Sequence, residues 1–546
     1  MKENIQNNLI KLIKKSQSAL GMDYLKEQIF LDLPQDSRFG DLSSNIALRL
    51  AKEAKAKSTD IAGRIVTAIR EDLKTSPVAD YVKDVRAEGA GFVNFYLSER
   101  YFYEELENIV AKGQDALRYD IGKEETVLIE FVSANPTGSL SVAHARQAAV
   151  GDVLASILEF LGFKVSREYY LNDEGNQINI LGDSVRLRIK ELEGERIDFP
   201  QNYYQGDYIY DIARKAQNES PDKVGDLGEY AAKYILESIK KELDDFGTGF
   251  DLWYSQKSLR ESEKIAQAIE FLRNKDFIYE KEGALWFKST EFGDDKDRVI
   301  IKSDGFYTYL APDIAYHWEK YKRGFKWLIN LWGPDHHGYI NRLKAACQAL
   351  GQTPDSLSIV IVQLVTIFRE GKPVQMSTRR GEYITLREVL DEVGRDAARF
   401  FFLMRRTSSH LDFDLETAKK QTPENPVYYV QYAHARICSI LKNSQVKINA
   451  KTLTPSLLKE KEEIALIKKI LQLQDVLNIC HKTLDPYALT VYLQEVAEAF
   501  HKFYDLHRVL GQEEALTHAR LALIQAARVV LATGLELMGI SRPESM

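Results

Sequence analysis

The sequence contains few cysteines and no cysteine pairs. The three that occur, Cys347, Cys438 and Cys480, lie far apart, and there is no CxxC motif. A thiolate zinc site or a disulfide framework is therefore not expected, and this cysteine usage favours a reducing cytoplasm.

Long hydrophobic runs and an excess of positive charge are also absent. No stretch approaches the ~18 apolar residues that a membrane-spanning helix needs, so no membrane partner is expected. The first thirty residues mix acidic residues with lysine along an amphipathic pattern, which is typical of a helix packed on a domain and not of a targeting peptide. The formal net charge of −7 argues mildly against a nucleic-acid partner, although it averages over all faces.

With 546 residues, the chain is too long for one hydrophobic core. Residues 1–115 predict an α+β unit that ends in the strand GFVNFYLS. Residues 120–410 predict an α/β domain of Rossmann type: the apolar run TVLIEFV, a helix from about 143 to 161 and the strand KVSREYY form a βαβ unit with a parallel sheet. A charged, mostly helical insertion is expected at about 172–295, after which the strands WLINLW and SIVIVQLV resume the sheet.

Residues 420–546 predict an all-α helical bundle. Asn425 can cap its first helix, with Pro426 at the first helical position, where the missing N–H of proline costs nothing.

The segment SANPTGSLSVAH, residues 133–144, joins the first strand of the predicted sheet to its helix. Ligand sites lie at the carboxyl ends of parallel strands, and helix N-termini stabilise phosphates, so this loop is a candidate phosphate site. His144 is placed to donate a hydrogen bond to a developing phosphate charge, and Pro136 and Gly138 would shape the turn. The alternative is an ordinary strand-to-helix turn with a surface histidine.

The longer run IEFVSANPTGSLSVAHARQAAVGDVLASIL resembles the signature segment of class I arginyl-tRNA synthetases. The same resemblance extends to FGDLSSNIALRLAK, GFVNFYLS, GPDHHGYINRLKAACQALG, NPVYYVQYAHARI and GISRPESM. It implies an arginine–tRNA ligase that activates arginine with Mg²⁺-bound ATP to arginyl-adenylate. The enzyme then transfers arginine to the 3′ end of tRNA(Arg), with release of AMP and pyrophosphate. It also implies a cytoplasmic protein and, as in most of the family, a monomer.

In this resemblance the first loop is the HIGH-type region. Its implied catalytic residues are Ser141 and His144. Two departures occur: Ser141 replaces the first histidine and can donate a hydrogen bond but not carry charge, and Ala143 adds a methyl group where adenine is expected to pack. The implied ATP-binding residues are Ala134, Pro136, Thr137, Gly138, Ser139, Leu140, Val142 and Ala143, with Gly333 and His336 of GPDHHG.

A second segment, EGKPVQMSTRRGEYITLREV, resembles the KMSKS loop. Ser377 and Arg379 are the implied catalytic residues, and Gln375, Met376 and Thr378 the implied ATP-binding ones; Gln375 and Thr378 stand at the two lysine positions. Cations here should stabilise charge on the departing pyrophosphate. The alternative is a solvated basic hairpin.

A guanidinium is planar and permanently charged, so its pocket should present carboxylates and a flat face. Tyr309 and Asp313 are spaced i,i+4 and can face one ligand. The resemblance assigns them to the guanidinium, and it assigns Glu130 and Asn135 to the ammonium and side-chain region. The full predicted arginine set is Glu130, Ser133, Asn135, Tyr309, Asp313 and Asp335.

The adjacent His336 and His337 invite a metal reading, but no third ligand stands at zinc spacing, so no metal site is expected. A contact of these histidines with adenosine and a satisfied loop histidine both remain open.

The helix from Pro426 carries tyrosines beside a cation, a combination that suits unstacked bases. We predict tRNA contacts at Tyr429, Tyr432 and Arg436; the alternative is an aromatic core stripe. The resemblance assigns the bundle to the anticodon and the N-terminal unit to the tRNA elbow. It also suggests that arginine activation requires bound tRNA. Two rival functions are a tRNA-binding paralogue that no longer charges and a synthetase for another amino acid.

Overall fold

The computed structural model describes residues 2–22, 29–34, 36–374 and 383–546. At its centre lies a five-stranded sheet in the order β11-β10-β4-β5-β6, in which every neighbouring pair is parallel. This confirms the α/β class and the parallel sheet. Its strands are β4 (Thr126–Glu130), β5 (Lys164–Leu171), β6 (Leu252–Ser255), β10 (Trp327–Trp332) and β11 (Leu357–Ile361).

The strand order reverses at β4, which has β5 on one side and β10 on the other. Such a switch point opens a crevice at the carboxyl ends of the strands. The crossover helix α5 (Val142–Phe160) is buried along most of its length, and α12 (Leu310–Lys322) and α13 (Ile340–Ala349) flank β10 in the chain.

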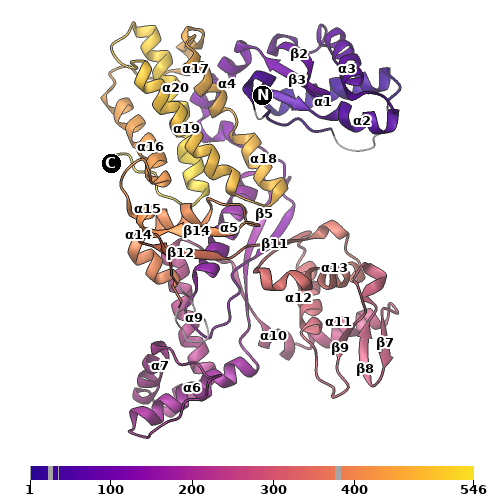
Figure 1. Cartoon of the computed structure of the whole chain (residues 1–546), viewed down its shortest axis with the longest axis vertical. Helices are drawn as coiled ribbons and strands as arrows, with labels where there is room; N and C mark the ends of the chain where they lie inside the picture. Colours follow the sequence, from indigo (N-terminus) through magenta and orange to yellow (C-terminus); the bar gives the residue numbers. More distant parts are fainter. Residues whose placement is uncertain (1, 23–28, 35, 375–382) are drawn as a thin grey trace.

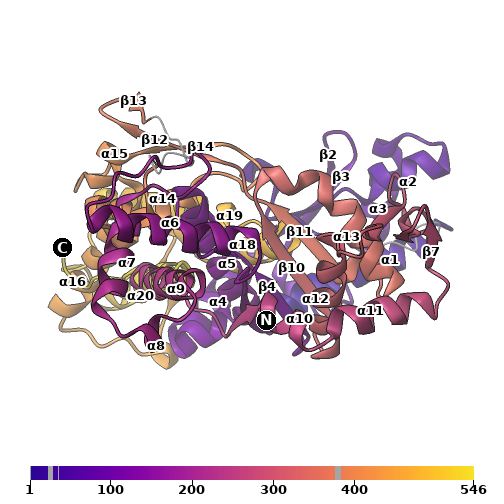
Figure 2. The same ribbon diagram turned by 90° about the horizontal axis from the view of Figure 1, so that it is seen from below.

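The chain leaves the sheet twice between β5 and β10 (Figures 1 and 2). The range 172–295, expected as one insertion, contains β6, which pairs with β5 and belongs to the sheet. Four residues are too short to give a strand signal against the helices around them. The first excursion, here called the helical lobe, comprises α6 (Asn176–Leu192), α7 (Asp207–Asn218), α8 (Pro221–Val224) and α9 (Leu227–Phe246). The second comprises α10 (Gln256–Glu261), α11 (Lys264–Arg273), β7 (Ile278–Lys281), β8 (Ala284–Phe287) and β9 (Arg298–Ile301).

The expected strand SIVIVQLV is split between two sheets. Its first half is β11, whereas its end begins β12 (Val365–Arg369), which pairs with β13 (Lys372–Pro373) and β14 (Leu411–Asp414). The guanidinium of the buried Arg146, on α5, donates to the carbonyl of Gln363 at 2.8 Å at this break. The helices α14 (Leu386–Phe402) and α15 (Leu415–Lys419) complete this region.

The N-terminal unit has an antiparallel sheet in the order β1-β3-β2, and the C-terminal unit is helical, as expected. The side chain of Asn425 accepts from the N–H of Val427, with Pro426 at the helix start. The N-terminal elements are β1 (Leu42–Ser44), β2 (Val82–Glu88), β3 (Phe92–Leu97), α1 (Lys2–Ala19), α2 (Ile46–Ala54) and α3 (Ser58–Leu73), followed by α4 (Glu99–Lys112). The bundle comprises α16 (Pro426–Asn443), α17 (Lys461–Ile470), α18 (Leu473–Thr483), α19 (Tyr487–Leu506) and α20 (Glu514–Leu537).

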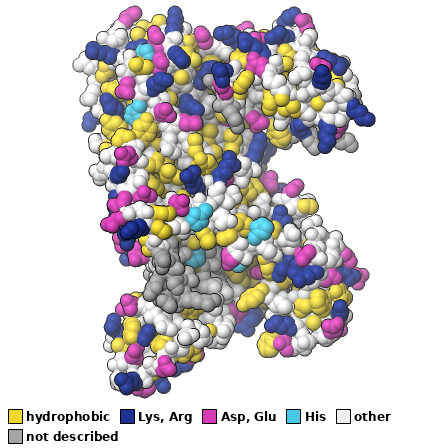
Figure 3. Space-filling model, in the orientation of Figure 1, with side chains coloured by type: hydrophobic (Ala, Val, Ile, Leu, Met, Phe, Trp, Pro, Cys, Tyr) yellow, Lys and Arg dark blue, Asp and Glu magenta, His cyan; other side chains and the backbone are white. Residues whose placement is uncertain are grey.

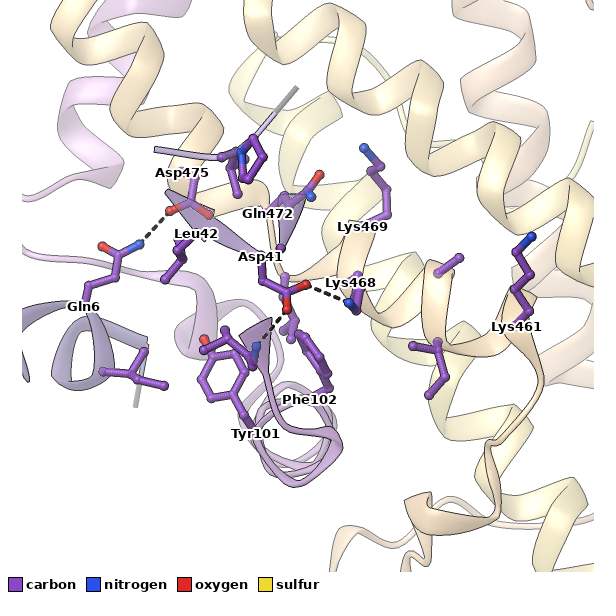
Figure 4. A pocket seen from close by; sticks show the side chains of 18 residues that line it. Gln6, Asp41, Leu42, Tyr101, Phe102, Lys461, Lys468, Lys469, Gln472 and Asp475 are labelled. Carbon is purple, nitrogen blue, oxygen red and sulfur yellow. Dashed lines mark hydrogen bonds and ion pairs between the residues drawn. The ribbon is translucent and has the colours of Figure 1, made fainter. Parts of the chain in front are cut away.

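A cavity of about 510 Å³ lies between the N-terminal unit and the bundle (Figure 4). Gln6 donates to Asp475 across it at 2.9 Å, and Lys468 pairs with Asp41 at 2.7 Å. The other oxygen of Asp41 accepts from the N–H of Leu97. Asp41 therefore ties β3 directly to the bundle helix α17.

Helix α20 is long and apolar enough to cross a membrane by length and composition. However, 67% of its apolar window is buried inside the protein. It packs against the bundle helices α16, α17 and α19.

Candidate active site

A cavity of about 600 Å³ opens at the carboxyl ends of β4 and β10. It brings together ten of the residues predicted from the sequence, although these come from three separate segments of the chain. They are Glu130, Ser133, Ala134, Asn135, His144, Tyr309, Asp313, Gly333, Asp335 and His336.

The backbone that leaves β4 is strained. Val132 and Ser133 both adopt left-handed backbone angles, with φ of 67° and 41°. For a β-branched residue such as Val132 this conformation is rare, and it costs about 1–3 kcal/mol. The Ser133 hydroxyl bonds Glu130 at 3.3 Å and accepts from the N–H of Tyr170 at 3.1 Å. These backbone angles turn the chain sharply from the sheet into the loop that lines the cavity.

Glu130 does not face the cavity as a free charge. The ammonium of Lys320, which is fully buried, forms an ion pair with it and also lies 3.4 Å from Asn330 Oδ1. Asn330 in turn bonds His317 Nε2 at 2.9 Å, and His317 Nδ1 donates to the carbonyl of Asp313 at 2.8 Å. Burial lowers the pKa of His317 well below its usual value, and Lys320 lowers it further, so the ring is neutral. This network fixes β4, β10 and α12 relative to one another.

Asp313 is the carboxylate with the least compensation in the cavity. Burial raises its pKa to about 7, and the charge of Glu130 adds to the rise, while a hydrogen bond from Tyr339 and the charge of Lys320 oppose it. The Tyr339 hydroxyl donates to Oδ2 at 2.6 Å. Within the described part of the chain no hydrogen bond to Oδ1 is recorded. That oxygen is therefore available to a cationic ligand.

His144 and Ser141 interact with each other at the start of α5. The N–H of Ser141 donates to His144 Nδ1 at 3.2 Å, and the Ser141 hydroxyl lies at the same distance from that nitrogen. Because Nδ1 accepts, the ring proton sits on Nε2. Burial lowers the pKa of His144 to about 4, with Asp335 opposing the shift. His144 is thus a neutral hydrogen-bond donor at the cavity.

The remaining residues of the first loop do not line this cavity. The side chains of Leu140 and Val142 are buried in the core, so a ligand could meet them only through their backbone. The same cavity lining omits Pro136, Thr137, Gly138, Ser139, Ser141 and Ala143. The predictions at Gln375, Met376, Ser377, Thr378 and Arg379 fall outside the described residues.

Sequence reasoning missed several polar residues around the cavity. His317, Lys320 and Asn330 were not among the candidates, although all three belong to the buried network. A signal existed: His317 and Lys320 follow Asp313 at helical spacing, and Asn330 interrupts the apolar strand WLINLW. Tyr170, Tyr316 and Tyr339 also line the cavity and offered no such signal.

The predicted tRNA residues gather on the bundle. Tyr432 stacks against Tyr428 with an interplanar angle of 7°, and Tyr429 and Tyr432 both contact the ring of His501. The guanidinium of Arg436 donates to the Tyr432 hydroxyl at 2.8 Å. These tyrosines and Arg436 are half-buried. The rings therefore pack against the bundle on one side and keep part of their surface exposed to solvent. We call Tyr428, Tyr429, Tyr432, Arg436 and His501 the bundle patch.

Acidic and basic side chains are interspersed over the face of the molecule drawn in Figure 3. Figures 1 and 3 also show a concave edge between the N-terminal unit and the region that contains α11, α12 and α13. The charge of this face is therefore mixed, in keeping with the modest net charge of the chain.

Three family models match the chain in succession. The Arginyl tRNA synthetase N terminal domain matches residues 1–97, the class I (R) tRNA synthetase catalytic domain matches residues 105–403, and the DALR anticodon binding domain matches residues 430–546.

Relatives match over nearly the full length. An arginine–tRNA ligase of Citrifermentans bemidjiense is 46% identical over 531 residues, which is 95% of each chain. Another, of Desulforamulus reducens, is 42% identical over 562 residues and covers 100% of this chain and 99% of its own. The solved Thermus thermophilus arginyl-tRNA synthetase is 20% identical, with a TM-score of 0.78 over 99% of this chain and 100% of its own, a likeness of fold.

Proposed function

Because the chain belongs to the class I arginyl-tRNA synthetases and is an arginine–tRNA ligase, we propose that the cavity at the carboxyl ends of β4 and β10 holds arginine and the adenylate formed from it. Asp313 and Tyr309 receive the guanidinium. Asn135 and Glu130 lie toward the ammonium, and His144 donates its Nε2–H to a phosphate oxygen.

The observation that carries this proposal is the state of Asp313. Glu130 already has a cation in Lys320, whereas Asp313 has a raised pKa and a carboxylate oxygen without a recorded partner among the described residues. Arginine would bring the missing permanent cation, in a form that can bond a carboxylate through two N–H groups. The exposed ring of Tyr309 adds a flat face beside it.

The chemistry needs positioning and charge stabilisation, not a covalent enzyme intermediate. The arginine carboxylate attacks the α-phosphorus of ATP and pyrophosphate leaves; a hydroxyl of the terminal tRNA ribose then attacks the acyl carbon and AMP leaves. We propose Mg²⁺ as the companion of ATP. No group of three or more metal-binding side chains occurs among the described residues, and magnesium on nucleotides relies mostly on phosphates and water, with one or two carboxylates. Asp335, whose exposed carboxylate lines the cavity, would be a candidate ligand, and the bound ion would neutralise phosphate charge.

The bundle patch would contact the anticodon loop, and the N-terminal unit the tRNA elbow. Exposed aromatic rings at Phe39 and Phe92 on the N-terminal unit support the second contact, since bases stack on such rings. We further propose that the protein acts in the cytoplasm, where its tRNA is used, and as a monomer.

A charging assay with labelled arginine and total tRNA tests this function directly. Arginine should be esterified to tRNA, whereas lysine and citrulline should not compete at equal concentration. ATP–pyrophosphate exchange should depend on added tRNA, and exchange at the same rate without tRNA would contradict that part. Charging of another amino acid in preference to arginine would contradict the assignment of the pocket.

The KM for arginine should depend on pH through Asp313. Its raised pKa means that the carboxyl is protonated below about pH 7, and a neutral acid cannot pair with the guanidinium. The KM should therefore rise as the pH falls below 7, by up to about tenfold per pH unit, and level off above pH 8. Initial rates between pH 5.5 and 8.5 measure this. In an Asp313→Asn variant the KM should lose this pH dependence; a flat profile in the wild type would refute it.

Replacing Tyr432 by alanine should raise the KM for tRNA about tenfold, since stacking of a base on an aromatic ring contributes about 1–3 kcal/mol. The KM values for arginine and ATP should stay close to those of the wild type at saturating tRNA, because the substitution lies outside the cavity that would hold these substrates. A Tyr432→Phe variant keeps the ring and loses only the contact with Arg436, so it serves as the matched control. Equal effects of the two substitutions would show that the ring does not stack on RNA.

A further inference from the structure

Two tyrosine hydroxyls converge on Gly138 in the loop of residues 133–141, here called the signature loop. Tyr208, on α7 of the helical lobe, donates to the carbonyl of Thr137 at 2.7 Å. Tyr383 donates to the carbonyl of Ser139 at 2.8 Å. A methyl group on Gly138 would lie 3.3 Å from the Tyr383 hydroxyl and 3.5 Å from that of Tyr208. The loop is thus held on both sides of a residue that has little room for a side chain.

The other helices of the lobe also contact the signature loop. Gln177, at the start of α6, accepts from the side-chain amide of Asn135 at 2.7 Å. Glu242, on α9, accepts from the backbone N–H of Leu140. In Figure 1 the lobe lies below α5 and α14. Three helices of the helical lobe therefore each form one hydrogen bond with the signature loop, and all three bonds fall within residues 135–140.

The two peptide groups that accept from the tyrosine hydroxyls differ in one respect. The peptide between Ser139 and Leu140 is held at both ends, its oxygen by Tyr383 and its N–H by Glu242. The peptide between Thr137 and Gly138 is held only at its oxygen, by Tyr208. In a trans peptide the C=O and N–H point in opposite directions. The bond from Tyr208 therefore directs the Gly138 N–H away from the helical lobe, and no acceptor for this N–H is recorded among the described residues.

We propose that Tyr208 is a positioning residue for ATP, whose hydroxyl orients the Thr137–Gly138 peptide so that the Gly138 N–H donates to a phosphate oxygen. A backbone N–H near a helix N-terminus is a suitable donor for an anion. Burial raises the pKa of Tyr208, so its hydroxyl stays protonated and keeps donating. The inference rests on the proposed function, because it takes the signature loop as part of the ATP site.

The test is a Tyr208→Phe variant in ATP–pyrophosphate exchange with saturating tRNA. It removes one hydroxyl and keeps the ring packed between α7 and the loop. The KM for ATP should rise about fivefold, because the net contribution of one hydrogen bond is about 1 kcal/mol. The KM for arginine should not change. Amide hydrogen exchange in residues 134–141 should also become faster. The matched control is Tyr210→Phe on the same helix, whose hydroxyl bonds Glu191 and Arg188 within the lobe.

A second variant, Gly138→Ala, places a methyl group between the two hydroxyls. It should also raise the KM for ATP, and the double variant should show less than the product of the two effects, because both act on one peptide. An unchanged KM for ATP in Tyr208→Phe, or the same loss in Tyr210→Phe, would overturn the inference while leaving arginine charging by the wild type intact. A wild type that charges no arginine would instead contradict the proposed function itself.

Discussion

An Asp313→Asn variant should lose about a thousandfold in kcat/KM for arginine, since removing one partner of a desolvated charge pair costs about 2–5 kcal/mol. The substitution keeps the size of the side chain and can still accept from Tyr339, so the cavity keeps its shape. Most of the loss should appear in the KM for arginine, with the KM for ATP nearly unchanged. Steady-state charging over a wide range of arginine concentrations measures it.

Glu319→Gln, on the same helix, is the matched control for this variant. Glu319 is absent from the lining of the cavity, and its partly exposed side chain pairs with Lys264 at 2.8 Å. Screening by water makes such a charge weak, so less than about a threefold change is expected. Thermal stability of Asp313→Asn should equal or exceed that of the wild type, because the folded, empty pocket disfavours the charged form of Asp313. An Asp313→Asn enzyme within tenfold of wild-type kcat/KM would remove the basis for the arginine pocket, since the expected loss is about a thousandfold.

An Arg399→Met variant should have a much lower free energy of unfolding than the wild type. Arg399, on α14, is fully buried; it pairs with Asp152 of α5 at 2.5 Å and donates to the carbonyl of Met538 at 2.7 Å. It also donates to the carbonyls of Phe246 and Gly247. Among the described residues, Arg167, 3.4 Å away, is then the cation that remains beside the buried Asp152. A loss of about 3 kcal/mol is expected, because removing one partner of a buried ion pair leaves the other charge poorly compensated.

The temperature at which half of the charging activity survives a fixed incubation measures this loss. Arg395→Met, on the same helix, removes a single exposed hydrogen bond to the carbonyl of Gly539 and serves as the control. Adding Asp152→Asn to Arg399→Met should recover part of the stability, because the buried charge is then gone. If the double variant were less stable than Arg399→Met alone, the ion pair would not be the source of the effect.

The parallel sheet could be predicted because β4 is a short apolar run between turn signals, and the signature loop because it follows that strand directly. The split of SIVIVQLV into two strands could not. It depends on Arg146, whose buried guanidinium meets carbonyls of Gln363 and of Arg406, more than two hundred residues away in the chain. The periodicity of hydrophobic residues reports only on residues that are close in sequence, so it cannot indicate such a contact.

The site was only partly predictable for a similar reason. Asp313 and Tyr309 lie four residues apart at the start of one helix, and both line the cavity, as their spacing predicted. Lys320 changes the role of Glu130 by pairing with it, and that pairing follows from the packing of α12 on β4. The net charge of −7 pointed away from a nucleic-acid partner. The match of residues 430–546 to a DALR anticodon-binding domain indicates a tRNA partner all the same, so the net charge of the whole chain was a poor guide.

The buried hydrophobic residues of the N-terminal unit, the sheet and the bundle form one connected cluster, which includes Ile5, Phe131 and Leu531. The seams between units therefore share hydrophobic packing, together with polar contacts such as Asp41 with Lys468 and Arg399 with the carbonyl of Met538. A chimera that exchanged the bundle for that of a distant relative would have to import both sides of each seam. Swapping anticodon specificity by domain grafting is accordingly a problem of interior repacking, and exchanging surface loops is the more promising route.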